Sequence, residues 1–163
     1  MAESIRIDSH KLVYHPKRVA KWLDGEITYP IELEIGISGA CNHRCIFCSC
    51  RHMGYKANYL DTDVVVDNMR TLGKLGLKSV VFAGEGEPLL HKDAAYIFTE
   101  TKKAGIDVAL STNGVLFTKD VAEKCLPSMT WIRFSIAAAS DKVHKVISGG
   151  GIWRHQSDLS KSA

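Results

Sequence analysis

The sequence lacks any long uninterrupted run of apolar residues. Its beginning, MAESIRIDSHKLVYHPKRVAKW, mixes charged with apolar side chains, so it has the pattern of neither a signal peptide nor a membrane span. Low-complexity segments and sequence repeats are also missing. The 163 residues are 45% hydrophobic and 24% charged, a composition typical of a soluble globular domain. We therefore expect a cytoplasmic protein with no membrane partner.

A strong excess of charge of one sign is missing too. The chain has 21 Lys and Arg against 18 Asp and Glu, a formal net charge of +3. Domains that bind nucleic acid usually carry a larger, clustered basic excess. No nucleic-acid partner is therefore expected, and a large RNA substrate is weakly disfavoured.

Cysteines are few, but four of the five lie close together in SGACNHRCIFCSCRHMGY, residues 38–55. A chain of this length can bury a core without disulfides. In a reducing compartment, clustered thiols more often bind metal or carry out redox chemistry than form structural disulfides. The odd total of five also fits full pairing poorly, so disulfides are disfavoured.

Segments typical of strands and helices alternate from Ile31 onward. In IELEIGI, residues 31–37, apolar side chains recur at every second position, which predicts a strand with one buried face. Three shorter β-rich runs follow: SVVFAG (79–84), IDVALSTNG (106–114) and WIRFSIAAA (131–139). Helices are predicted between and after them: from Asp61 or Thr62 to Gly76, over 94–104, from Thr118 to Leu126, and from Ser140 onward.

This order, with strands about 25 to 30 residues apart, predicts βαβ units and hence an α/β fold with a parallel sheet. We expect residues 1–30 to form a preface with a short helix over 16–23, and residues 31–163 to form the core domain. The end, SGGGIWRHQSDLSKSA, predicts a loop and the beginning of another helix. Four parallel strands would leave a sheet edge open, so we expect a core that is incomplete at its C-terminus.

Cys41, Cys45 and Cys48 are spaced Cys-x3-Cys-x2-Cys, directly after the first predicted strand. Sites in α/β proteins are built at the carboxyl ends of strands. Three thiolates that converge there need a cation to hold them together, and the neighbouring Arg44 and His43 favour the thiolate form. The loop is therefore a candidate metal site.

Two other interpretations of this spacing were weighed. Intervals of four and three also describe one face of a helix with small buried cysteines, but the polar residues between them and the flanking Gly39 and Gly54 favour a loop. A zinc site could take Cys50, His43 or His52 as its fourth ligand, yet structural zinc usually uses two separated ligand pairs and no second pair exists. Three cysteines that leave one coordination position open favour a cluster that binds a cofactor or substrate.

With Phe47 directly before its last cysteine, the motif resembles that of the radical S-adenosylmethionine (radical SAM) superfamily. Further matches follow in order. GEGEPLLH (84–91) resembles the family's Gly-Gly-Glu-Pro motif with Glu85 in place of a glycine, STNG (111–114) ends the third strand, and RFSI (133–136) resembles the fourth strand. The resemblance covers residues 30–151. It implies a partial parallel (β/α) barrel, cut short after about four βα units.

The resemblance also implies cofactors and roles. Cys41, Cys45 and Cys48 would hold a [4Fe-4S] cluster whose remaining iron chelates S-adenosylmethionine. The other implied contacts are with that cofactor: Phe47 against the adenine, Gly86 and Glu87 at the methionine end, and Ser111, Asn113 and Ser135 as candidates for the ribose or carboxylate. Asn113 also fits an ordinary turn at the end of a strand.

The activity implied is reductive cleavage of S-adenosylmethionine to a 5′-deoxyadenosyl radical, which abstracts hydrogen from an unidentified substrate. It implies an external one-electron reductant of the flavodoxin or ferredoxin type. The alternative is a non-catalytic iron-sulfur or zinc module, although such a module has no need for GEGEPLL beside the cysteines. A third hypothesis is a truncated chain that folds poorly by itself.

Five remaining residues are left outside the site. Cys50 lies beyond the matched triad, and Cys125 is expected in the core. His91 and His144 are expected in ordinary packing or surface positions because the sequence identifies no partner for either. Glu85, the departure from the family motif, either contacts substrate or points to solvent.

Overall fold

The computed structural model describes residues 11–54 and 57–149. The chain divides by its internal contacts into two units, residues 1–30 and 31–163. In the first unit, a short 3-10 helix (Lys11–Tyr14) precedes helix α1 (Pro16–Leu23), which begins at a proline as the sequence predicts. The loop and helix predicted at the end of the chain lie, after Gly149, outside the described residues.

The second unit contains one parallel sheet of four strands in the order β1-β2-β3-β4. This is the α/β architecture predicted from the alternation of strands and helices. Each observed strand is shorter than the apolar run that predicted it, because the ends of the runs form the turns that carry the site. The strands are β1 (Glu32–Ile35), β2 (Ser79–Phe82), β3 (Asp107–Thr112) and β4 (Met129–Phe134).

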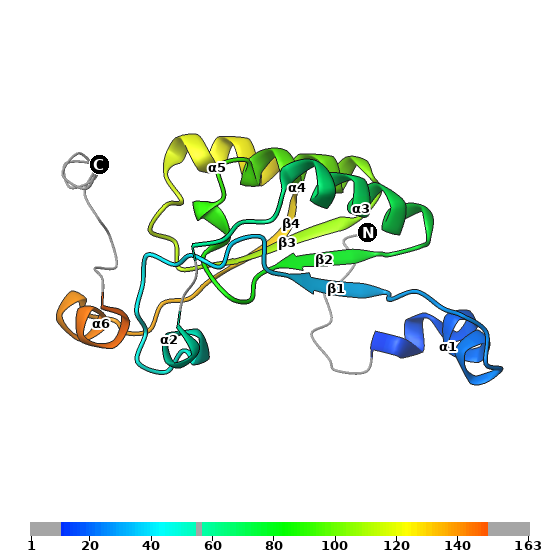
Figure 1. The fold of residues 1–163 in the computed structure, drawn as a ribbon, viewed down its shortest axis with the longest axis horizontal. Coiled ribbons are helices and arrows are strands. Elements are labelled where there is room, and N and C mark those ends of the chain that lie inside the picture. Colours follow the sequence, from blue (N-terminus) through cyan, green and yellow to red (C-terminus); the bar gives the residue numbers. More distant parts are fainter. Residues whose placement is uncertain (1–10, 55–56, 150–163) are drawn as a thin grey trace, which may run out of the picture. The chain divides into compact units, whose positions relative to one another are not determined.

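Helices α3, α4 and α5 cover one face of the sheet, whereas α2 and α6 lie beyond the carboxyl ends of the strands (Figure 1). The short helix α2, which contains Cys50, was not predicted from the sequence. None of the described helices is long and apolar enough to cross a bilayer. The bounds are α2 (Ser49–Met53), α3 (Thr62–Lys74), α4 (Ala94–Lys103), α5 (Lys119–Cys125) and α6 (Asp141–Ser148), with 3-10 turns at Pro88–Leu90 and Leu126–Ser128.

Three helices begin at the capping residues that the sequence predicts. The Asp61 side chain accepts hydrogen bonds from the backbone N–H groups of Asp63 and Val64 at the start of α3. Thr118 and Ser140 cap α5 and α6 in the same way. Each cap satisfies amide groups that have no partner within the helix, so the helix starts follow from local sequence.

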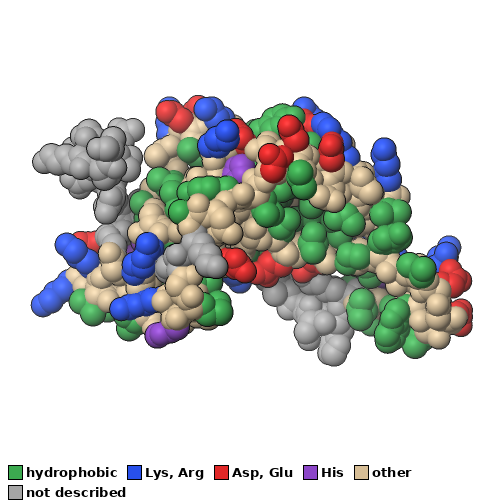
Figure 2. Space-filling model, in the orientation of Figure 1, with side chains coloured by type: hydrophobic (Ala, Val, Ile, Leu, Met, Phe, Trp, Pro, Cys, Tyr) green, Lys and Arg blue, Asp and Glu red, His purple; other side chains and the backbone are tan. Residues whose placement is uncertain are grey.

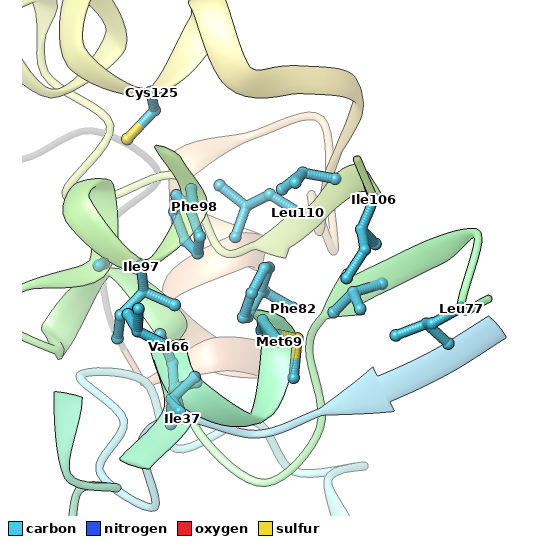
Figure 3. Close-up of a cluster of buried hydrophobic side chains, with 14 residues drawn as sticks. Ile37, Val66, Met69, Leu77, Phe82, Ile97, Phe98, Ile106, Leu110 and Cys125 are labelled. Atoms are coloured by element: carbon cyan, nitrogen blue, oxygen red, sulfur yellow. The ribbon is translucent and has the colours of Figure 1, made fainter. Parts of the chain in front are cut away.

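The hydrophobic core lies between the sheet and α3, α4 and α5 (Figure 3). Phe82 on β2 and Phe98 on α4 are fully buried, with ring centroids 4.7 Å apart. Burying a side chain of this size contributes about 1.5–3 kcal/mol. Cys125 is fully buried in the same cluster, so its predicted place in the core is confirmed. The core fixes the strands whose carboxyl ends carry the site.

Candidate functional site

A cavity of about 300 Å³ lies at the carboxyl ends of the strands. It is bounded by the loop that carries Cys41, Cys45 and Cys48, here called the cysteine loop, and by the turns after β2, β3 and β4. The structure brings all nine sequence-predicted site residues to the lining of this cavity. They are Cys41, Cys45, Phe47, Cys48, Gly86, Glu87, Ser111, Asn113 and Ser135. Residues up to 94 positions apart in sequence therefore meet at one place, as the parallel topology requires.

The cysteine loop packs directly against the turn after β2. The backbone N–H of Glu87 donates to the carbonyl oxygen of Ala40 at 2.8 Å. A Cβ atom on Gly86 would lie 2.2 Å from the Ala40 oxygen and 2.3 Å from the Ser38 oxygen. No side chain fits in that space, so a glycine is required by the close approach of two backbones. This explains, in this chain, the glycine before Glu87.

Glu87 connects two segments, its own turn after β2 and the end of β3, through its buried carboxylate, which is 2% exposed. It accepts hydrogen bonds from the Thr112 hydroxyl at 2.6 Å, the Asn113 N–H at 2.8 Å and the Leu89 N–H at 3.2 Å. Burial raises the pKa of Glu87, and these donors oppose the rise because they stabilise the carboxylate. The side chain thus fixes the ends of β2 and β3 to each other at the edge of the cavity.

Asn113 extends this connection to the cysteine loop. Its side-chain amide donates to the Asn42 side-chain oxygen at 2.6 Å. Its own side-chain oxygen accepts from the Val115 N–H at 3.0 Å, as expected for an asparagine in a turn. The sequence suggested Asn113 as a cofactor contact or as a turn residue. In the structure it lines the cavity and also holds the turn and the cysteine loop together.

The C-terminal end of α6 binds the other side of the cysteine loop. The Arg44 N–H donates to the Ser148 carbonyl at 2.7 Å, and the Ile46 N–H donates to the Ile147 carbonyl at 2.9 Å. Carbonyl groups in the last turn of a helix have no partner within it, and here two of them are satisfied by the loop. The loop is therefore held from three directions: the turn after β2, the turn after β3, and α6.

Two buried histidines meet where α6 contacts the loop. The rings of His43 and His144 are 5.5 Å apart in an edge-to-face arrangement, and both line the cavity. His144 Nδ1 lies 3.0 Å from the Ser148 hydroxyl oxygen, and that hydroxyl donates to the His144 carbonyl at 2.8 Å. The packing role expected for His144 is found, but its place at the cavity was missed. The only sequence signal for that place would have been the helical spacing that puts His144 and Ser148 on the same face of α6.

His91 has the packing role expected from the sequence. It is 4% exposed, its Nδ1 accepts from the Asp93 N–H at 3.1 Å, and its Nε2 lies 2.8 Å from the Leu60 carbonyl. Since Nδ1 accepts, Nε2 carries the proton and donates to Leu60. This side chain joins the start of α4 to the segment before α3, away from the cysteines.

Charged side chains of both signs line the cavity beyond the predicted residues. Arg133 on β4 donates from Nε and Nη2 to the Ser111 hydroxyl at 3.2 and 3.1 Å. Glu34 on β1 and Glu85 after β2 lie at the same cavity, and Glu85 is also exposed to solvent. Glu34 and Arg133 were missed because the sequence gives no sign of which strand face points toward a site.

The thiols of the loop need a cation to become ligands. Burial is the largest cause that raises the pKa values of Cys41 and Cys45, and the negative charge of neighbouring groups adds to it: Glu87 and Cys45 act on Cys41, and Cys48 acts on Cys45. Thiolates at such positions form when a metal group supplies positive charge and displaces the protons. The donor set therefore fits a bound cationic metal group.

The arrangement does not resemble a site for a single ion. Within residues 11–54 and 57–149, no three His, Cys, Asp or Glu side chains converge in the way that one metal ion needs. In a [4Fe-4S] cluster each cysteine binds a different iron, so three sulfurs spread around one cavity fit it better. Cys50, on α2, lies outside the cavity lining in the described part of the chain.

Comparison with known proteins decides the family. The family model described as "Radical SAM superfamily" matches residues 35–158. The chain belongs to the radical SAM superfamily. The resemblance noted in the sequence is thereby confirmed, and the superfamily is one of enzymes that bind a [4Fe-4S] cluster and S-adenosylmethionine.

Individual relatives agree with this membership. The chain is 34% identical over 123 residues to a protein named probable GTP 3′,8-cyclase from Saccharolobus solfataricus, covering 74% of this chain and 39% of that protein. It is 34% identical over 88 residues to the GTP 3′,8-cyclase of Clostridium acetobutylicum, covering 52% and 27%. The crystal structure of Streptococcus suis SuiB bound to S-adenosylmethionine matches with a TM-score of 0.69 at 24% identity, covering 86% and 33%.

The structural match confirms the predicted fold class. The four parallel strands correspond to part of the (β/α) barrel of such neighbours. The chain spans between 27% and 39% of the length of these three relatives. Their named activities and ligands are properties of those longer proteins.

Proposed function

We propose that this radical SAM chain forms the cofactor-binding half of an enzyme core, in which Cys41, Cys45 and Cys48 hold a [4Fe-4S] cluster and the adjoining cavity holds S-adenosylmethionine. The observation that supports the proposal most strongly is the convergence of these cysteines with the GEGEP turn and the ends of β3 and β4 on one cavity. Its volume of about 300 Å³ is at the lower end of the range for small-molecule sites.

Bound there, the two cofactors would supply one-electron reductive cleavage of S-adenosylmethionine to methionine and a 5′-deoxyadenosyl radical that abstracts hydrogen from a substrate. The protein's contribution is to orient and to shield them. The backbone around Gly86 and the buried Glu87 fix one wall, and the three attachments of the cysteine loop hold the ligands in place. Preorganised ligands avoid the cost of ordering the loop at each turnover.

The charges of the cavity fit a zwitterionic cofactor that also carries a sulfonium. Glu34, Glu85 and Glu87 offer negative charge to the ammonium and sulfonium groups. Arg133, with the hydroxyl of Ser111, offers a positive group and a polar neighbour to a carboxylate. Phe47, 69% exposed at the rim, offers a flat apolar face to an adenine. Ser135 and Asn113 complete the polar lining near the ribose.

The proposal includes an external one-electron reductant of the flavodoxin or ferredoxin type, and a substrate whose identity is open. Residues 31–163 act as the core domain in this proposal, with residues 1–30 as a preface. A non-catalytic cluster carrier is the second candidate. Its distinguishing property is a cluster that forms but leaves added S-adenosylmethionine intact.

The test begins with anaerobic reconstitution of the full chain with iron and sulfide. We expect one [4Fe-4S] cluster per chain, and methionine with 5′-deoxyadenosine after addition of dithionite and S-adenosylmethionine. Cys41→Ala, Cys45→Ala and Cys48→Ala should each abolish cluster binding, while the matched control Cys50→Ala should retain it. A complete cluster in any of the first three variants contradicts the ligand assignment, and a cluster without cleavage products favours the carrier.

A further inference from the structure

Helix α6 has two different faces. Basic side chains gather on the surface in the region where Figure 1 places α2 and α6 (Figure 2), and Lys142, Lys145 and Val146 of α6 are exposed. His144 and Ser148, one helical turn apart on the opposite face, are 2% and 0% exposed. The inward face of α6 therefore buries a polar pair, which is costly unless its members have hydrogen-bond partners.

The two buried side chains are hydrogen-bonded to each other, and this sets the orientation of the histidine ring. The Ser148 hydroxyl donates to the His144 carbonyl at 2.8 Å. The hydroxyl oxygen also lies 3.0 Å from His144 Nδ1, so Nδ1 carries a proton and donates to that oxygen. With Nδ1 held in this way, the His144 ring is fixed at the place where α6 contacts the cysteine loop.

The His144 ring packs on the ring of His43, which lies between the first two cysteines of the loop. The two ring centroids are 5.5 Å apart in an edge-to-face arrangement, a favourable geometry for aromatic pairs, and His43 is 3% exposed. The next residue is held as well, because the Arg44 N–H donates to the Ser148 carbonyl at 2.7 Å. Helix α6 thus fixes the side chain of His43 and the backbone that follows it.

The backbone N–H of His43 is directed at one of the candidate cluster ligands. It donates to the sulfur of Cys41, with the nitrogen and sulfur 3.4 Å apart. Hydrogen bonds to the sulfurs of an iron-sulfur cluster help to set its reduction potential. Reduction by one electron adds negative charge to the cluster and its sulfur ligands, and an N–H directed at a sulfur stabilises that charge. Such a hydrogen bond therefore raises the potential.

We propose that His144 is a positioning residue that raises the reduction potential of a cluster bound to the cysteine loop. It does so by holding His43 so that the His43 N–H stays directed at the Cys41 sulfur. This inference rests on the proposed function, since it requires a cluster ligated by Cys41. The electron comes from the external one-electron reductant of that proposal, and no bond forms or breaks and no proton moves. His144 acts through His43 rather than on the reacting atoms.

The test compares two variants that differ in one property. His144→Leu and His144→Phe both lose the hydrogen bond to Ser148 and both fill the space of the imidazole, so neither admits water, but only phenylalanine keeps a ring against His43. The matched control is His91→Leu. His91 is also buried, at 4% exposed, and also has an edge-to-face ring contact, with Tyr59 at 5.9 Å. It lies away from the cysteines, so this variant reports the effect of losing any buried histidine.

The first measurement needs no cluster. It is the exchange rate of the His43 amide hydrogen in the apo protein, measured by NMR and divided by the rate of a core amide in β3 to correct for global stability. In His144→Leu this ratio should be at least about fivefold higher than in the wild type. In His144→Phe and His91→Leu it should stay within about twofold of the wild-type value.

The second measurement is the midpoint potential of the reconstituted cluster, from a redox titration followed by electron paramagnetic resonance. In His144→Leu, one-electron reduction should be about tenfold less favourable, which corresponds to a midpoint about 59 mV lower. His144→Phe and His91→Leu should stay within about threefold of the wild type. A merely structural role of His144 would lower the iron content or the melting temperature and leave the potential of the assembled clusters unchanged.

A wild-type potential in His144→Leu with a complete cluster overturns the proposal. Equal shifts in His144→Leu and His144→Phe also overturn it, because the ring would then not be responsible, and so does a similar shift in His91→Leu. If His144→Leu does not fold, His144→Met, which also lacks a ring, is measured in its place. Failure of the wild type to assemble a cluster overturns the proposed function itself, whereas an assembled cluster with an unchanged potential overturns only the role of His144.

Discussion

The hydrophobic core and the site at the carboxyl ends of the strands are held together by different kinds of contact. Between the sheet and α3, α4 and α5, the contacts are apolar and continuous, with Phe82 and Phe98 fully buried. At the carboxyl ends of the strands, the cysteine loop is held by individual backbone and polar hydrogen bonds to the turns and to α6. The core contributes stability in proportion to its buried apolar area. The hydrogen bonds at the site fix the position of the cysteine loop.

This difference predicts which property, stability or cofactor binding, a substitution in each region should change. Apolar burial is tolerant of small shifts but costs much when a large side chain is removed. The cysteine loop is held by directional hydrogen bonds and by one close backbone contact at Gly86, so a small change there should alter its geometry. The same change should cost the protein little free energy of unfolding. Stability and cofactor binding should therefore be separable by mutation, which the following predictions test from the largest expected effect to the smallest.

Phe98→Ala should have the largest effect on folding. It removes a fully buried ring that contacts Phe82 at 4.7 Å between centroids, and such changes cost about 3–5 kcal/mol of unfolding free energy. Urea denaturation followed by circular dichroism measures the loss. The exposed Val146→Ala is the control and should change stability by less than about 0.5 kcal/mol. Similar losses in the two variants would remove the distinction between core and surface.

Gly86→Ala should disable the site with a smaller effect on folding. The new Cβ would lie 2.2 Å from the Ala40 oxygen, so the cysteine loop must move, at a cost of about 1–3 kcal/mol. We expect a cooperative unfolding transition together with most of the iron binding lost after reconstitution. Gly36→Ala, whose Cβ would meet its nearest atom at 3.3 Å, is the matched control and should keep its iron. Wild-type iron content in Gly86→Ala would contradict this account of the close contact between Gly86 and the cysteine loop.

Glu87→Gln should alter how stability depends on pH. Because the pKa of Glu87 is raised above its ordinary 4.5 by burial, the folded state holds the proton more tightly than the unfolded state. Its favourable contribution is complete below pH 4.5 and is lost as the pH rises through the raised pKa. The variant should lack this fall, which is measured as the difference between the two stability curves in apo protein. The exposed Glu85→Gln is the control, and a difference curve of the same shape there would argue against a role for burial.

Asn42→Ala should have the smallest effect. It removes one exposed side-chain hydrogen bond, from Asn113 at 2.6 Å, which contributes about 0.5–1.5 kcal/mol. The other attachments of the loop remain, so the cluster should still form. We expect weaker protection of the cysteine loop against hydrogen exchange, measured as faster exchange of the Arg44 and Ile46 amides. Loss of the cluster in this variant would show that one polar contact outweighs the backbone attachments.

Much of the fold could be predicted because it depends on local signals. The alternating apolar residues of β1, and the capping residues Asp61, Thr118 and Ser140, mark their elements directly. The motif residues followed from a family pattern, and the structure brings all of them to one cavity. Their roles in binding the cofactor stay predictions.

The rest depends on contacts between distant segments, which no local pattern encodes. His144 and Ser148 line the cavity because α6 docks against the cysteine loop through the carbonyls of its last turn. Arg133 and Glu34 reach it because they lie on the face of the sheet that α3, α4 and α5 do not cover. Helix α2 was missed because its five residues are too few to show a period.

The central claim is that the loop holds a cluster with one iron available to S-adenosylmethionine. The most direct measurement is the electron paramagnetic resonance spectrum of the reconstituted, dithionite-reduced full chain, recorded with and without S-adenosylmethionine. We predict a [4Fe-4S] signal whose g-values shift when S-adenosylmethionine is added. A spectrum that is unchanged by the cofactor, or a protein that binds zinc and no iron, would contradict the claim.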